Sequence, residues 1–73
     1  MHEYVAYLAR AGPGYDPSDW HITVHDLEDP DRVGPEGTVE SAEKRVLGHW
    51  FRDRGFTITG EFLDGRAFRL RRT

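Results

Sequence analysis

The sequence predicts an α+β fold in which one amphipathic helix packs on one face of a mainly antiparallel sheet of four or five strands. Three observations lead to this prediction. Several short stretches of the 73-residue chain alternate apolar and polar side chains. A single longer stretch has apolar residues at helical spacing. Segments rich in glycine and proline separate these stretches and indicate loops. We therefore expect the order strand-strand-(short strand)-helix-strand-strand, in a single domain over residues 1–73.

The first two strands are expected at residues 3–10 and 20–27. The first stretch is apolar on both faces, which is typical of a central strand, and we assign Val5 and Tyr7 to its core side. The second stretch, WHITVHDL, alternates cleanly between an apolar face and a face that carries two histidines. It therefore predicts a half-buried strand, and a short third strand is expected around Arg32 to Gly34.

The helix is expected from Val39 to Arg54, where apolar residues form one stripe. Thr38 is a suitable N-cap, and Gly55 is suitable for the left-handed residue that follows a helix. After it, FTITGEF and RAFRLRR alternate with period two around Asp64-Gly65, which predicts a hairpin. The expected core consists of Val5, Tyr7, Ile22, Val24, Val46, Leu47, Trp50, Phe56, Ile58, Phe62, Phe68 and Leu70.

Composition and length limit the classes of function. The chain has no cysteine, so disulfides and thiolate metal ligands are excluded. We read no signal peptide and no apolar stretch of about 20 residues, and therefore expect a cytoplasmic protein without membrane contact. A chain of this length has room for one core but little room for a deep catalytic cleft.

No catalytic, cofactor-binding or metal-ligating residues are expected. The sequence contains no phosphate-binding glycine loop and no nucleophile elbow. His21 and His25 lie on one face of a strand, about 13 Å apart, which is too far to share one zinc ion. We therefore expect a protein that is not an enzyme and that needs no cofactor.

Charge divides the chain into two parts. Residues 11–44 hold nine acidic against two basic residues, a balance of −7, whereas residues 45–73 have a balance of +4. The candidate residues for binding a protein partner lie in the acidic part and are Asp26, Glu28, Asp29 and Asp31. The candidate residues for binding nucleic acid, the alternative function, are Arg66, Arg69, Arg71 and Arg72. The last strand carries these arginines, and we favour the interpretation that they chiefly protect an exposed sheet edge over nucleic-acid binding.

One family resemblance points to the first of these functions. In VHDLEDPDRVGPEGTVESAEKRVLGHW, the order and spacing of Asp26-Leu27, Thr38, Glu40 and Ala42 resemble HicB-type antitoxins, as do the aromatics Tyr4 and Tyr15. The resemblance covers residues 4–51 and leaves out that family's DNA-binding domain. It implies a strand-strand-strand-helix core that binds a partner protein, typically a small ribonuclease toxin.

The sequence therefore favours a small non-catalytic interaction protein, antitoxin-like, that acts by stoichiometric protein binding. The acidic part would suit a basic or nucleic-acid-handling partner, because complementary charge steers association. The alternative is a nucleic-acid-binding module that uses the arginine-rich C-terminal hairpin. This alternative ranks second because the outer face of the predicted hairpin carries no aromatic side chains on which bases could stack.

Overall fold

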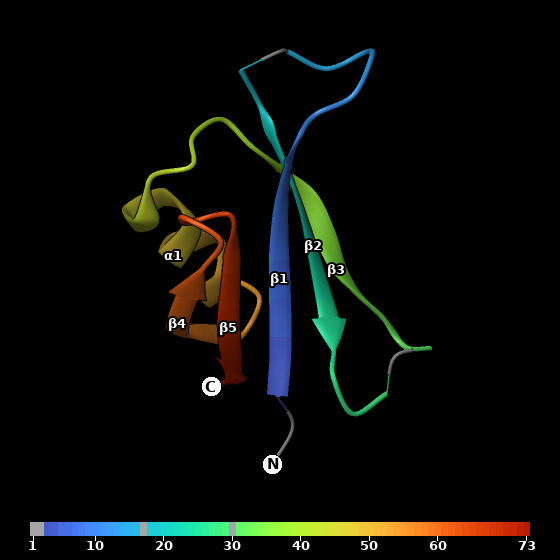
Figure 1. The fold of residues 1–73 in the computed structure, drawn as a ribbon, viewed down its shortest axis with the longest axis vertical. Helices are drawn as coiled ribbons and strands as arrows, with labels where there is room; N and C mark the ends of the chain where they lie inside the picture. Colours follow the sequence, from blue (N-terminus) through green and yellow to red (C-terminus); the bar gives the residue numbers. More distant parts are fainter. Residues whose placement is uncertain (1–2, 17, 30) are drawn as a thin grey trace.

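A computed structural model describes residues 3–16, 18–29 and 31–73, and within them it contains one helix and a five-stranded antiparallel sheet (Figure 1). The elements are β1 (Glu3–Arg10), β2 (Trp20–Asp26), β3 (Val33–Val39), α1 (Lys44–Arg52), β4 (Phe56–Phe62) and β5 (Ala67–Arg72). The strand order is β3-β2-β1-β5-β4. The predicted α+β class and its element order are confirmed.

Strand β1 lies at the centre of the sheet and joins its two halves. It pairs antiparallel with β2 on one side and with β5 on the other, so that Ala6 lies between Val24 and Phe68. The first and last strands of the chain are therefore neighbours (Figure 1). In this central position, side chains of β2 and β5 flank those of β1 on each face, and Val5 is buried as well as Tyr4 and Ala6.

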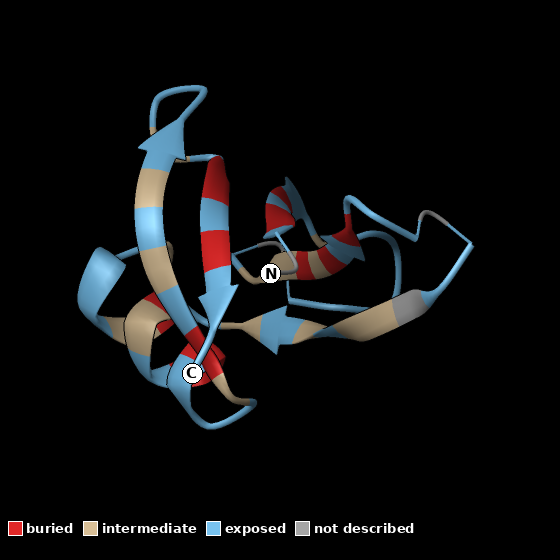
Figure 2. Ribbon diagram, turned by 90° about the horizontal axis from the view of Figure 1, so that it is seen from below, coloured by how far each residue is buried: buried red, intermediate tan, exposed pale blue. Residues whose placement is uncertain are grey.

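The main core lies between the sheet and α1. From the helix, Leu47, Trp50 and Phe51 are buried against it. The sheet contributes the buried side chains of Tyr4, Ala6, Leu8, Ile22, Val24, Phe56, Phe68 and Leu70. Aromatic rings meet edge to face within this core, with the ring centres of Tyr4 and Phe56 4.9 Å apart. From Phe68 to Arg71, buried and exposed residues alternate along β5, as expected for a strand with one face on the core (Figure 2).

For two residues the prediction that they lie in the core is wrong. Tyr7 is 42% exposed and Phe62 is 40% exposed, and both lie on the sheet face opposite α1. For Tyr7, the two apolar faces of β1 gave no basis for choosing the one that meets the helix. For Phe62, the pairing register of β4 with β5 shifts between Ile58 and Gly60. A shift of one residue turns all later side chains of a strand to the opposite face.

The helix is also shorter than predicted, since α1 covers nine residues from Lys44 to Arg52. Thr38, the expected N-cap, lies in β3 and pairs with His21 of β2. The strand therefore extends well past the short one expected around Arg32 to Gly34, because backbone pairing with β2 outweighs the local helical pattern. Within the described residues, no helix is long and apolar enough to cross a membrane.

Strand β3 approaches its neighbours closely at a glycine. A Cβ atom on Gly34 would overlap the backbone carbonyl oxygen of Val24, which cannot move aside without disturbing β2. Gly48, in contrast, lies within α1, and outside the backbone of its own helix a Cβ atom there would meet nothing within 4 Å.

These two glycines give a matched pair of stability predictions. Gly34→Ala should lower the free energy of unfolding by about 1–3 kcal/mol, because the methyl group overpacks against backbone. Gly48→Ala should raise it by about 0.5–1 kcal/mol, because alanine loses less backbone entropy in a helix. Urea unfolding of both variants measures the two effects. Equal destabilisation by the two changes would contradict the tight packing of β3 on β2.

The predicted hairpin turn is confirmed at the end of β4. Leu63, Asp64 and Gly65 all have positive φ angles, 55°, 54° and 82°. The amide of Arg66 donates a hydrogen bond to the carbonyl oxygen of Leu63 at 3.1 Å. Asparagine or aspartate tolerates this left-handed conformation, whereas leucine adopts it at a cost.

Replacing Leu63 should therefore stabilise the hairpin. Leu63→Asn is expected to raise the free energy of unfolding by about 1 kcal/mol, because it relieves the left-handed strain at an exposed position. Leu63→Ala is the control, since it shortens the side chain but keeps the strained backbone. If Leu63→Ala and Leu63→Asn raise the unfolding temperature equally, the loss of the leucine side chain, not the relief of backbone strain, decides the effect.

Candidate functional site

The sheet face that α1 leaves uncovered is the candidate site, and we call it the open face. The pairing registers place Phe62, Ala67, Tyr7 and Thr23 in one row across β4, β5, β1 and β2. Along β5, Arg69 and Arg71 point to the same face as Ala67, because alternate residues of a strand share a face. The open face thus combines aromatic and cationic side chains.

The two aromatic rings of this row lie on either side of Ala67. Ala67 is fully buried although α1 does not cover it, which indicates that its larger neighbours shield it. Tyr7 and Phe62 are two strands apart, about 10 Å at the usual strand spacing. The ring of Tyr7 also meets the ring of His25 edge to face, with 5.6 Å between their centres. The open face therefore carries two half-exposed rings at a fixed separation.

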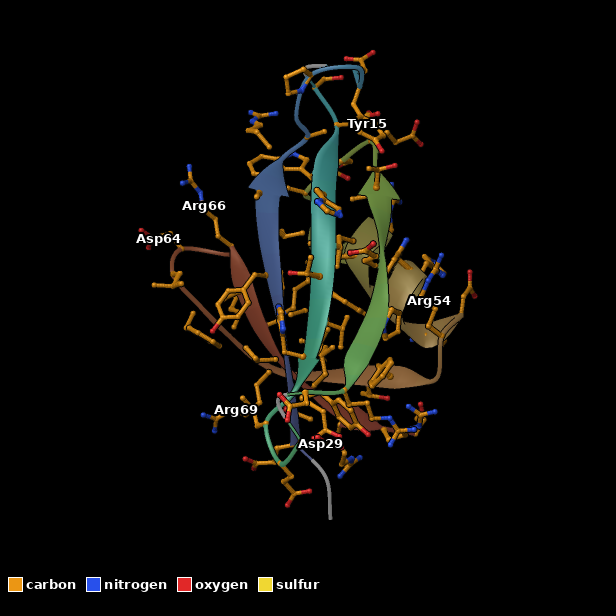
Figure 3. All side chains as sticks on the ribbon, turned by 90° about the vertical axis from the view of Figure 1, so that its right-hand side faces the viewer. Tyr15, Asp29, Arg54, Asp64, Arg66 and Arg69 are labelled. Atoms are coloured by element: carbon orange, nitrogen blue, oxygen red, sulfur yellow. The ribbon has the colours of Figure 1, made fainter. Side chains whose placement is uncertain are left out.

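The arginines of β5 lie beside these rings. Arg69 pairs with Val5 of β1, and Arg71 pairs with Glu3. Because Glu3 can offset part of the charge of Arg71, Arg69 is the less compensated cation. Figure 3 shows Arg66 and Arg69 on the side of the sheet opposite α1, whereas Arg54 lies on the helix side. The Arg72 guanidinium lies over the ring of Phe56, 5.2 Å from its centre, and so belongs to the helix side.

The interpretation that these arginines protect a sheet edge is wrong. Strand β5 pairs with β1 and with β4, so it is an interior strand and has no free edge. The expectation of an edge position rests only on this strand being the last in the chain. The order of strands in a sheet does not follow from their order in the sequence. The edge strands are β3 and β4.

The acidic candidate residues lie at the end of β2 and in the loop after it, and Asp26 lines a pocket of about 180 Å³ together with Arg72 of β5. Asp26 is only 3% exposed, and its Oδ1 atom accepts a hydrogen bond from the backbone amide of Glu28 at 2.9 Å. Its carboxylate is therefore placed to hold the turn after β2 rather than to contact a partner. Glu28, Asp29 and Asp31 are exposed in the loop that follows, and Leu27 is 52% exposed beside them. In Figure 3, Asp29 lies at the opposite end of the sheet from Arg66.

The histidines of β2 take part in local contacts. The Nε2 atom of His25 lies 3.2 Å from the hydroxyl of Thr23, and His21 lies 3.9 Å from the carboxylate of Glu36. The part of the chain that the structure describes contains no group of three or more histidine, aspartate or glutamate residues that could hold a metal ion.

One carboxylate away from the open face has a perturbed acidity. The backbone amide and hydroxyl of Ser18 both donate hydrogen bonds to Asp16 Oδ1, at 2.9 and 2.7 Å. These bonds stabilise the ionised form and hold the pKa of Asp16 below its usual value. They shape the loop between β1 and β2.

Comparison of the chain with protein families, with curated proteins and with solved structures finds no match. The resemblance to HicB-type antitoxins over residues 4–51 therefore stays a prediction.

The sequence did contain one signal for the open face. Gly60 interrupts the alternation of FTITGEF, and a glycine inside a strand pattern is typical of a β-bulge. Counting the alternation separately before and after Gly60 would have placed Phe62 on the sheet face opposite to that of Phe56. Phe62 then shares a face with Tyr7, provided that Tyr7 is assigned to the face of β1 away from the helix. The sequence offers no comparable signal for which face of β1 meets the helix.

The interior position of β5 leads to a testable expectation. The double change Arg69→Thr and Arg71→Thr should leave self-association unchanged, because these side chains guard no edge. Sedimentation velocity of the parent and variant measures this at matched ionic strength. A variant that dimerises while the parent stays monomeric would contradict the interior position of β5.

Proposed function

We propose that this protein is a non-catalytic binding module that holds single-stranded nucleic acid on the open face of its sheet. The observation that carries this proposal is the row in which the half-exposed rings of Tyr7 and Phe62 flank Ala67, beside Arg69 on the same face. The sequence predicts an outer face without aromatic side chains, and the exposed positions of Tyr7 and Phe62 contradict this expectation.

Aromatic rings on a sheet are suited to unpaired bases. A base without a pairing partner exposes its flat surfaces, and stacking on a side chain is worth about 1–3 kcal/mol per base. A duplex keeps its bases stacked inside, so the rings of Tyr7 and Phe62 favour single strands over duplexes. The separation of about 10 Å between the rings leaves room for one stacking site on each.

The cations of the open face supply the second component. Arg69 has a planar guanidinium that can pair with a phosphate in two hydrogen bonds or stack on a base. Arg71 and Arg66 extend the positive charge along the strand and into the turn that precedes it. The net charge of −3 and the partial compensation by Glu3 argue for modest affinity, on the order of 10⁻⁵ M at physiological salt.

A protein partner remains the second candidate, and one observation favours it. Leu27 is half-exposed within the acidic loop, next to Glu28, Asp29 and Asp31. An exposed apolar side chain surrounded by carboxylates suits a basic partner protein with an apolar pocket. This surface excludes Asp26, which is buried, and it would act independently of the open face.

Removing the rings tests the first proposal. Tyr7→Ser and Phe62→Ser should each weaken binding of a single-stranded oligonucleotide of about ten nucleotides by roughly 5- to 150-fold, the equivalent of one lost base stack. Fluorescence anisotropy at low salt measures the change. Tyr15→Ser is the matched control, because Tyr15 is 60% exposed in the loop between β1 and β2 and should leave binding unchanged.

Salt dependence separates the contribution of phosphate contacts. Arg69→Thr should reduce the slope of log affinity against log salt by roughly 0.7, the value for one lost phosphate contact on a single strand. Arg32→Thr removes an exposed arginine outside the open face and should leave the slope unchanged. Equal affinity of the parent for duplex and single strand, or equal binding by Tyr7→Ser and the parent, would rule out stacking on the open face.

A further inference from the structure

A second surface lies on the other side of β4 from β5, and it combines a free strand edge with a basic helix. Strand β4 ends the sheet order, so among the described residues no strand pairs with the other side of its backbone. Unpaired amide and carbonyl groups along such an edge can pair with an added strand. The other edge strand, β3, contains Pro35, which lacks an amide proton and so cannot donate a hydrogen bond to an added strand at that position.

The edge of β4 is poorly protected by its own sequence. Natural edge strands are blunted by proline, by charged side chains or by a β-bulge, and of these β4 has only the bulge between Ile58 and Gly60 along its first five residues. In β4, residues 56–60 are Phe-Thr-Ile-Thr-Gly, and the first charged residue is Glu61. Protection of this edge against unwanted pairing must therefore come from elsewhere in the molecule.

A groove runs along this edge, between β4 and α1. It has a volume of about 320 Å³, and on the strand side it is bordered by Phe56, Thr57 and Ile58. Side chains of consecutive strand residues point to opposite faces, so a groove bordered by three in a row lies against the strand edge itself. Gly48 of α1 also lines the groove, and the absence of a side chain there leaves open space.

The helix side of the groove is basic. Lys44, Arg45, His49 and Arg52 line it, and all four are exposed. The sequence of α1, KRVLGHWFR, contains no acidic residue. The contact of Arg45 with Glu43, at 4.0 Å between two largely exposed side chains, offsets little of this charge. The basic side chains span about 12 Å along the helix axis, enough to meet two alternate residues of an extended strand.

We propose that this groove binds an extended acidic segment of a partner protein, which adds a strand to the β4 edge. Backbone hydrogen bonds to β4 would hold the segment, and alternate acidic side chains would meet Arg45 and Arg52 on α1. A second copy of this protein fits less well, because pairing two β4 edges would bring two basic helices together. The basic helix thus protects the edge from self-pairing while it admits an acidic strand.

A peptide of defined chemistry tests this proposal. The probe is a seven-residue peptide that alternates glutamate with valine and is blocked at both ends. We expect one-to-one binding at low salt, and in NMR spectra the backbone amides of β4 should exchange their hydrogens with solvent more slowly. The same peptide with N-methyl groups on alternate amides should bind at least about tenfold more weakly, because it cannot form one side of the hydrogen-bonded ladder.

Variants assign the charge contribution to the groove. Arg45→Glu combined with Arg52→Glu should weaken peptide binding by at least about tenfold, because repulsion replaces attraction. Arg69→Thr combined with Arg71→Thr is the matched control on the open face and should leave peptide binding unchanged. A peptide that alternates lysine with valine should not bind to the parent.

Three results would overturn the proposal. Equal binding of the N-methylated and unmodified peptides would show that no strand is added. Chemical-shift changes confined to the open face would place the peptide elsewhere. Binding of a single-stranded oligonucleotide that is abolished by the Arg45 and Arg52 changes, without any binding of the acidic peptide, would make the groove a nucleic-acid site. Since the open face and the groove carry separate variants, failure of one proposal leaves the other testable.

Discussion

The pairing of β1 with β5 is the contact on which the rest of the fold depends. It connects a meander of three strands at the start of the chain to a hairpin at its end, with Tyr7 opposite Ala67 and Tyr4 opposite Leu70. Neither half alone offers a sheet wide enough to bury the apolar stripe of α1, which contacts both β3 and β4. Joining such distant segments costs loop-closure entropy, and the contacts that offset this cost form only when both halves are in place. The domain is therefore expected to fold as one unit.

The same pairing decides which surfaces are available for binding. Because β5 is inserted between β1 and β4, its arginines are placed on a sheet face and not on an edge. The sheet edge on this side is formed by β4, and the cations beside that edge belong to α1. The two basic surfaces therefore differ in kind. The open face presents rings and guanidinium groups to a ligand that lies flat on it, whereas the groove presents backbone groups to a ligand that extends the sheet.

The sequence was sufficient for the class of fold, for the hairpin turn at Asp64-Gly65 and for the clean alternation of β2. It was insufficient wherever a local pattern competed with long-range pairing. The helical stripe starting at Val39 yielded to the ladder between β3 and β2, and the two apolar faces of β1 left the side that meets α1 undetermined. The candidate site depended on these undetermined points, since placing Tyr7 and Phe62 in the core removed the rings from the surface.

The register shift between Ile58 and Gly60 has an evolutionary consequence. One extra residue in β4 moves Phe62 from the core side to the open face without changing any side chain. A single-codon insertion or deletion at this point would therefore add or remove a surface ring in one step, while Phe56 and the helix contacts before it stay in place. Relatives of this protein could gain or lose an aromatic platform by a change in length alone, which comparison of residue identities at aligned positions would overlook.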